Sequence, residues 1–108
     1  MNGDFQRVAS VDELPEGTMA AVMLGDGKEI LLIHAAGRFF ALDIMCTHQE
    51  AWLDSGFFHP DSMEVECPLH EGRFDVRTGN VTSPPPTEPI AAYEVTVEDD
   101  EVYVRAGN

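Results

Sequence analysis

Strict alternation of apolar and polar residues marks the end of the chain. Residues 94–98 alternate, Tyr93 extends their apolar face, and the alternation resumes over residues 101–105 after the acidic pair Asp99-Asp100. Successive side chains of a strand point to opposite faces, so a period of two is typical of a half-buried strand. The pattern therefore predicts a C-terminal β-hairpin.

The first half of the chain shows a second set of strand-like segments. Residues 19–24 and 29–34 flank the sequence GDGK at residues 25–28, whose Asp-Gly pair suits a tight hairpin turn. A further turn at residues 35–37 leads into another segment of strand character over residues 38–42. We expect three antiparallel strands here.

Short strands at close spacing, punctuated by Gly and Pro, predict an all-β fold with an antiparallel sandwich or barrel-like base. One helical signal, a capping box at residues 10–13, is cut short by Pro15 and supports a single turn at most. The strand rhythm fails between about residues 43 and 89, so we expect a loop-rich subdomain inserted there. The chain has 108 residues, of which 44% are hydrophobic, and residues 1–108 are expected to form a single domain.

The charge of the chain limits the classes of partner. Six Lys and Arg residues against 20 Asp and Glu residues give a formal net charge of −14. Such a charge repels nucleic acid and anionic membrane surfaces, and it suits either simple solubility or steering toward a basic partner protein. No apolar run approaches the roughly 18 residues that span a bilayer, and the N-terminus lacks the layout of a secretion signal. We therefore expect a cytoplasmic protein that binds neither nucleic acid nor a membrane.

Two cysteine-histidine pairs carry the candidate chemistry. Cys46 and His48 form a C-x-H pair, and after 18 intervening residues Cys67 and His70 form a C-x-x-H pair. Two thiolates and two imidazoles suit either tetrahedral Zn²⁺ or the irons of an iron-sulfur cluster. C-x-H is tighter than the spacing of about two to four residues that paired ligands of structural zinc modules commonly show. A structural zinc module remains the less favoured alternative.

The sequence resembles the Rieske family at these pairs and over nearly the whole chain. Beyond the pairs, the resemblance rests on further matching positions: Gly72, Phe74, Asp75, the Thr78-Gly79 turn and the proline run at residues 83–89, which in this family folds over the cluster. In this family two loops each give one Cys and one His, the cysteines binding one iron and the histidines the other. The resemblance thus implies one [2Fe–2S] cluster bound by four ligands: Cys46, His48, Cys67 and His70.

Within that family the chain is most similar to the ferredoxin components of bacterial aromatic-ring dioxygenase systems. The resemblance implies a monomeric electron carrier, not itself an enzyme, that takes single electrons from a flavoprotein reductase using NAD(P)H to a terminal oxygenase. Two features depart from the family pattern: Glu71 stands where Gly is usual, and the loop over residues 49–66 is slightly long. Neither touches a ligand, so both bear on partner docking more than on cluster binding.

Two alternatives concern the reaction. A Rieske-type small subunit of a nitrite reductase, or of another multi-subunit oxidoreductase, resembles this chain in size, although many such subunits lack the four ligands. A mononuclear iron enzyme would need two further histidines beside a carboxylate. His34 and His59 are the spare histidines, and we expect both to be solvated.

The residues around the ligands predict the redox potential within the Rieske range of roughly −150 to +300 mV. High-potential members donate hydrogen bonds from a Ser and a Tyr hydroxyl and tie the loops with a disulfide. This chain has Gly72 and Phe74 at the hydroxyl positions, and Ala51 and Leu69 at the disulfide positions. Because donors to the sulfurs stabilise the added electron, their absence predicts a low potential.

Electron transfer needs proximity, so His48 and His70 are expected to lie at the surface that meets the partner. A docking rim is predicted around them, made of these residues: Gln49, Glu50, Trp52, Glu71 and Pro84 to Pro86. For Trp52, packing beneath the first loop is favoured over a docking role.

Overall fold

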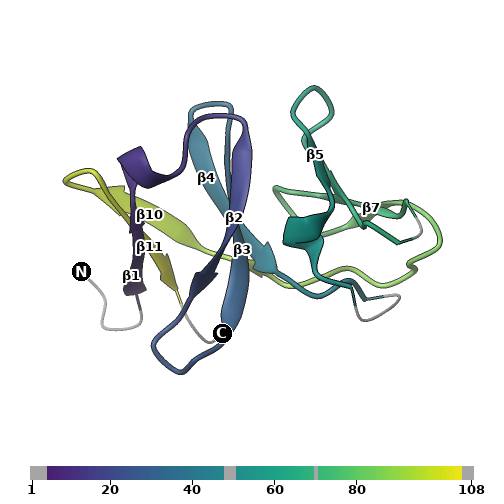
Figure 1. Ribbon diagram of the computed structural model, residues 1–108, viewed down its shortest axis with the longest axis horizontal. Helices are drawn as coiled ribbons and strands as arrows, with labels where there is room; N and C mark the ends of the chain where they lie inside the picture. Colours follow the sequence, from purple (N-terminus) through teal and green to yellow (C-terminus); the bar gives the residue numbers. More distant parts are fainter. Residues whose placement is uncertain (1–4, 48–50, 70, 106–108) are drawn as a thin grey trace.

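The computed structural model describes residues 5–47, 51–69 and 71–105, and nearly all regular structure in them is strand (Figure 1). The elements in chain order are β1 (Phe5–Ser10), η1 (Val11–Glu13), β2 (Thr18–Met23), β3 (Glu29–Ala35), β4 (Arg38–Asp43), η2 (Leu53–Ser55), β5 (Phe57–His59), β6 (Glu64–Glu66), β7 (Arg73–Asp75), β8 (Val81–Ser83), β9 (Ala92–Tyr93), β10 (Val95–Glu98) and β11 (Glu101–Arg105). The predicted all-β class is confirmed, and none of the described helices is long and apolar enough to cross a membrane.

The base of the molecule consists of two antiparallel sheets. One has the strand order β1-β11-β10, and the other has the order β2-β3-β4-β9. The predicted hairpins are confirmed, since β10 pairs with β11 and β2 pairs with β3, the latter around a turn in which Gly27 has a φ of +91°. The capping box also forms, as the Ser10 N–H donates to Glu13 Oε1 at 2.9 Å at the start of the one-turn helix η1.

Strand β3 divides the interior of the molecule into two cores. Ile30 and Leu32 belong to the core of the base, whereas Leu31 and Ile33 belong to a second core that extends toward the cysteines. All four side chains are fully buried, because alternate residues of a strand point to opposite faces and both faces of β3 are covered. Strand β3 therefore belongs to both the base and the core that contains the cysteines, and β4 does the same through Ala41 and Leu42.

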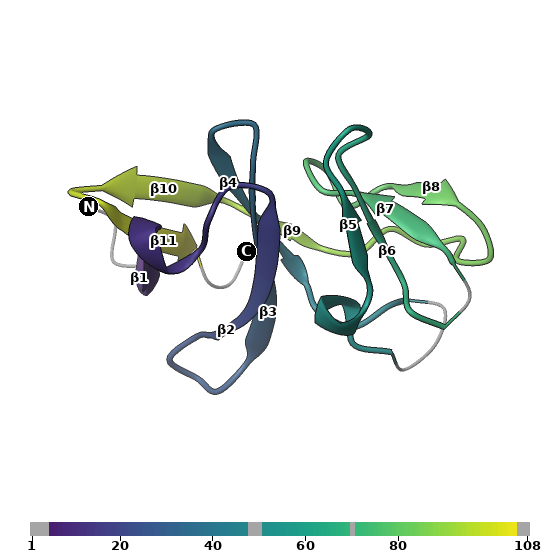
Figure 2. The same ribbon diagram turned by 45° about the horizontal axis from the view of Figure 1, so that its top comes forward.

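The middle of the chain is more regular than expected. Strands β5, β6, β7 and β8 form a four-stranded antiparallel sheet that makes a second lobe beside the base (Figures 1 and 2). The prediction of a loop-rich insertion missed this sheet, because each strand has only three residues and alternation over three residues gives no clear period. The chain then returns from this lobe to the base through residues 84–91 (Figure 2).

Candidate metal centre

The first cysteine lies at the start of a loop that the backbone closes at both ends. After β4, Met45 forms an isolated antiparallel bridge with Trp52. Between them, the Cys46 N–H donates to the Ala51 carbonyl oxygen at 3.0 Å, and one step outside, the Leu53 N–H donates to the Ile44 carbonyl at 2.8 Å. These hydrogen bonds hold together the two ends of the first loop, residues 46–51.

The second cysteine lies at the same position in a loop of the same length. Cys67 follows β6 directly, and its N–H donates to the Gly72 carbonyl oxygen at 2.8 Å. Strands β6 and β7 continue the pairing outward, with Glu66 opposite Arg73. The second loop, residues 67–72, is therefore the tip of a hairpin and is closed between its first and sixth residues, as the first loop is.

Both cysteines are buried in one shared core. Cys46 is 4% exposed and Cys67 is 2% exposed, and both belong to the second core together with Leu53, Val65 and Phe74. The two loops come from different parts of the chain, and the core is what their cysteines share. The structure thus places in one core two cysteines that lie 21 positions apart in the sequence.

The segment after β8 contacts both loops. The Thr47 hydroxyl donates to the Glu88 carbonyl oxygen at 2.8 Å, which ties this segment to the first loop. At the second loop, a Cβ on Gly72 would lie 2.3 Å from Cδ of Pro86 and 2.7 Å from its Cγ. Only glycine permits so close an approach, so the proline segment packs directly on the second loop.

The predicted histidine ligands cannot be placed in the same way. His48 and His70, with Gln49 and Glu50 of the predicted docking rim, lie outside the described residues. In sequence, one histidine falls within each closed loop. Two buried thiols and one histidine in each loop form a donor set that suits a [2Fe–2S] cluster with mixed ligation. The four-residue ligand set remains a prediction that this arrangement fits.

The structure shows the surroundings of the four residues that bear on the redox potential. A serine at Gly72 would collide with Pro86, and the Phe74 side chain is fully buried in the shared core without a hydroxyl to donate. Ala51 is 5% exposed whereas Leu69 is 55% exposed. The described neighbourhood of the cysteines is accordingly apolar at all four positions.

The expectation for Trp52 is wrong. Its side chain is 47% exposed instead of being packed beneath the first loop. Trp52 forms a backbone bridge with Met45, while its neighbour Leu53 is fully buried in the core that contains the cysteines. Together with the exposed Leu69, Trp52 puts large apolar surface next to the two cysteine loops.

The expectation of two solvated histidines is wrong for His34, whose side chain is 15% exposed, and holds in part for His59, whose side chain is 34% exposed. His34 Nδ1 lies 2.7 Å from the Leu14 carbonyl oxygen, and its ring stacks on Phe39 at a centroid distance of 4.0 Å. His59 Nε2 lies 2.6 Å from Oε1 of Glu66. Both contacts join residues that are distant in the sequence or lie on different strands, which is why no local sequence pattern predicts them.

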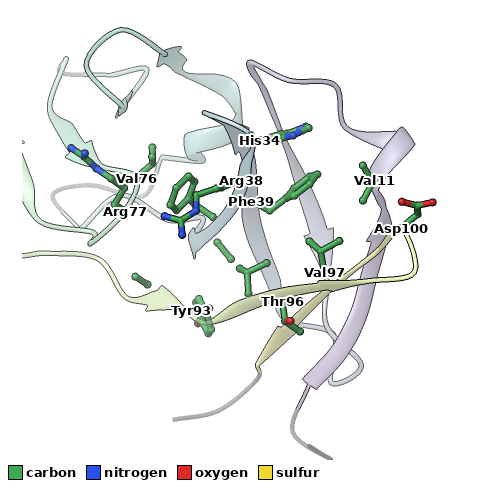
Figure 3. Close-up of a pocket in the computed structure, with 15 residues that line it drawn as sticks. Val11, His34, Arg38, Phe39, Val76, Arg77, Tyr93, Thr96, Val97 and Asp100 are labelled. Atoms are coloured by element: carbon green, nitrogen blue, oxygen red, sulfur yellow. The ribbon is translucent and has the colours of Figure 1, made fainter. Parts of the chain in front are cut away.

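A cavity of about 580 Å³ lies where the base meets the second lobe, and its lining does not include the cysteines. It opens between β4, β10 and the turn after β7 (Figure 3), and neither cysteine lines it. Its wall mixes apolar and polar surface, with the guanidinium groups of Arg38 and Arg77 on one side (Figure 3). The cavity offers no thiol or thioether to a metal ion.

Comparison with known proteins gives a consistent result over nearly the full length. Residues 4–94 match the Rieske [2Fe-2S] domain family. The chain is 41% identical over 105 residues to the ferredoxin component of the naphthalene 1,2-dioxygenase/salicylate 5-hydroxylase systems of Ralstonia sp., covering 97% of this chain and 98% of that protein.

Solved structures extend the likeness to the fold. The ferredoxin of carbazole 1,9a-dioxygenase from Nocardioides aromaticivorans IC177 superimposes with a TM-score of 0.90 at 42% identity, covering 97% of this chain and 100% of that one. A complex of reduced oxygenase and oxidized ferredoxin in carbazole 1,9a-dioxygenase contains a chain that matches with a TM-score of 0.86 at 33% identity, covering 96% of this chain and 94% of that one.

Proposed function

Because the chain belongs to the Rieske [2Fe–2S] domain family, we propose that it is a low-potential ferredoxin of an aromatic-ring dioxygenase system. In this role it is a cytoplasmic monomer that takes single electrons from a flavin-dependent NAD(P)H reductase to the terminal oxygenase. The observation that carries the proposal is the pair of equally closed loops, each with one cysteine buried in the shared core. Similarity to dioxygenase ferredoxins over nearly the full length supports it against the nitrite reductase alternative.

Four residues are proposed to hold the cluster: Cys46 and Cys67 on one iron, and His48 and His70 on the other. A [2Fe–2S] cluster supplies reversible one-electron chemistry when bound. The chain contributes the rest. The buried cysteines fix the inner side of the site, and each histidine follows its cysteine by two or three positions within a loop that the backbone closes.

The proposed low potential follows from what surrounds the cysteines. Reduction adds negative charge, which hydrogen-bond donors to sulfur would stabilise. Gly72 and Phe74 provide no hydroxyl, and Pro86 leaves no room for one at Gly72. The net charge of −14 further opposes the added electron. We expect a midpoint near the bottom of the Rieske range of roughly −150 to +300 mV.

The proposed docking face lies at the two loops. Trp52 and Leu69 are 47% and 55% exposed, and exposed apolar side chains gathered at a functional edge favour a protein partner. Glu71 is also exposed there and adds negative charge. Acidic charge steers encounters with a basic partner and does so less at high salt.

Spectroscopy of the purified protein tests the proposal. An iron-sulfur cluster gives a coloured protein and an EPR signal after reduction with dithionite, whereas a structural zinc module gives neither. His48→Cys is expected to alter both the reduced spectrum and the midpoint, and unchanged values would remove His48 from the ligand set. Constant copurification with a large reductase subunit would favour the nitrite reductase alternative.

A further inference from the structure

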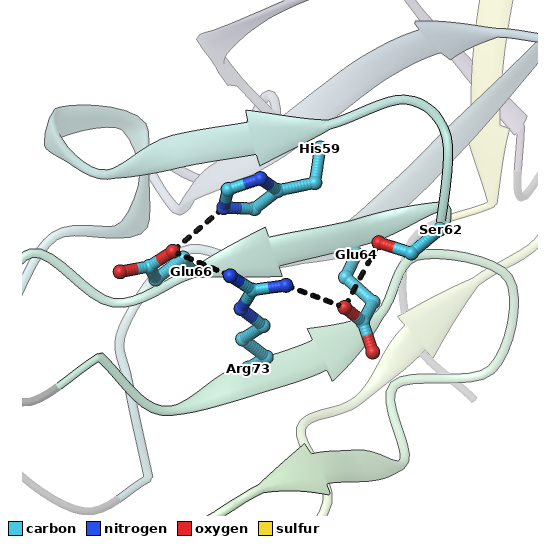
Figure 4. Close-up of polar contacts among 5 residues, drawn as sticks. All are labelled: His59, Ser62, Glu64, Glu66 and Arg73. Atoms are coloured by element: carbon cyan, nitrogen blue, oxygen red, sulfur yellow. Dashed lines mark hydrogen bonds and ion pairs between the residues drawn. The ribbon is translucent and has the colours of Figure 1, made fainter.

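A cluster of charged side chains lies on β5, β6 and β7, next to the ends of the second loop. His59 of β5 contacts Glu66 of β6, with Nε2 2.6 Å from Oε1 (Figure 4). Arg73 of β7 approaches the same Oε1 at 3.3 Å and donates to Glu64 Oε1 at 3.0 Å. The Ser62 hydroxyl completes the cluster by donating to Glu64 at 2.9 Å. Three neighbouring strands are joined by these side chains.

The burial of the two carboxylates makes these contacts matter. The side chains of Glu64 and Glu66 are only 16% and 14% exposed, so each has lost most of its water and needs donors from the protein. One guanidinium, that of Arg73, serves both. Glu66 has His59 as its second partner, and Nε2 donates to it when that nitrogen carries the proton.

The position of this cluster in the sheet links it to the ligand loop. Glu66 pairs with Arg73 in the register of β6 and β7. Cys67 directly follows Glu66, and Gly72 directly precedes Arg73, so the two charged residues flank the closing hydrogen bond between Cys67 and Gly72. A change in the pairing of β6 with β7 at Glu66 and Arg73 would therefore act directly on Cys67, the next residue in the chain.

We propose that His59 is a positioning residue of the cluster site, acting through Glu66. By holding the Glu66 carboxylate against Arg73, it joins β5 to the β6-β7 hairpin. It thereby helps to maintain the hydrogen bond between Cys67 and Gly72 that closes the second loop. The consequence is a longer lifetime of the bound cluster. This inference rests on the proposed function, because it presumes that Cys67 and His70 hold iron.

Two substitutions of His59 separate positioning from packing. His59→Leu removes the donor to Glu66, whereas His59→Gln retains an N–H group near the place of Nε2. We expect His59→Leu to lose its cluster about tenfold faster than the wild type, as loss of groups that orient metal ligands commonly does. His59→Gln should stay close to the wild-type rate. Bleaching of the visible absorbance in the presence of an iron chelator measures this rate.

The matched control is His34→Leu, because His34 also has a carboxylate neighbour, Glu16, at 3.4 Å but lies in the base. We expect wild-type cluster loss for this variant. Equal acceleration in His34→Leu and His59→Leu would overturn the proposal, since it would indicate general destabilisation. A wild-type rate in His59→Leu would overturn it as well.

Glu66→Gln and Arg73→Gln add a second discrimination. If the two charges acted on the cluster only through their fields, their removal would shift the midpoint in opposite directions and leave cluster loss unchanged, which would contradict the proposal. Positioning predicts that both substitutions accelerate cluster loss. A wild type without any cluster spectrum would refute the proposed function itself, so the two failures are distinguishable.

Discussion

The two cysteine loops are closed by the same type of backbone hydrogen bond but are flanked by different side chains. In each loop the cysteine N–H donates to the carbonyl of the sixth residue. The first loop is flanked by the apolar pair Met45 and Trp52, whereas the second is flanked by Glu66 and Arg73. The backbone thus sets a common loop geometry, and the side chains decide whether packing or charge maintains it. The two loops should therefore respond differently to substitution and to pH.

The largest expected effect comes from the core that both loops share. Phe74 is fully buried there with both cysteines, so Phe74→Ala should lower the free energy of unfolding by about 3–5 kcal/mol. Phe57→Ala is the control, because that side chain is 60% exposed and its loss should change little. Chemical denaturation measures both. A small effect of Phe74→Ala would mean that the loops do not depend on a common core.

Gly72→Ala should act on the second loop alone. The added Cβ would lie 2.3 Å from Cδ of Pro86, and overpacking of this kind costs about 1–3 kcal/mol of unfolding free energy. Gly25→Ala serves as the comparison, since its Cβ would meet only the flexible end of Gln6, at 3.0 Å. If Gly72→Ala were as stable as the wild type, the proline segment would not be packed against the second loop.

Thr47→Val should act on the first loop alone. It removes the hydrogen bond from the Thr47 hydroxyl to the Glu88 carbonyl, worth about 0.5–1.5 kcal/mol of stability. Thr18→Val is a matched control, because the Thr18 hydroxyl donates to the Pro15 carbonyl at 2.7 Å in the base. Both variants should lose similar stability, but only Thr47→Val should also speed cluster loss. Equal cluster loss in both would show that this tie does not hold the loop.

The smallest expected effect is a loss of stability in acid, through the charged cluster next to the second loop. Hydrogen bonds from Thr82, and then from Arg73 and Ser62, hold the pKa of Glu64 below the ordinary value of 4.5. A carboxyl group whose pKa is lowered by folding stabilises the fold at any pH above its pKa in the unfolded state. This contribution is lost as the pH falls through its pKa in the folded state. Stability should therefore decline below about pH 4.5. Glu64→Gln should show a shallower decline in denaturation midpoints, and an equally steep one would contradict this assignment.

Local patterns predicted the hairpins of the base, and they also supplied the candidate ligands, which stay a prediction. The hairpins around residues 25–28 and 99–100 rest on alternation and turn chemistry, which are properties of neighbouring residues. The cysteine-histidine pairs were likewise visible as short motifs. The carboxylate contacts of His59 and Arg73 were not predictable in this way, because they require the register of three short strands. The exposure of Trp52 was not predicted either, because it depends on how the chain pairs and packs around the first loop.

EPR-monitored redox titration of the reduced protein tests the central claim most directly. The claim is that two similar loops hold one cluster of mixed cysteine and histidine ligation, with no hydroxyl at positions 72 and 74 to donate to its sulfurs. We predict a single Rieske-type signal with a midpoint near the bottom of the range of roughly −150 to +300 mV. Absence of that signal, or a midpoint well above about +100 mV, would contradict the account.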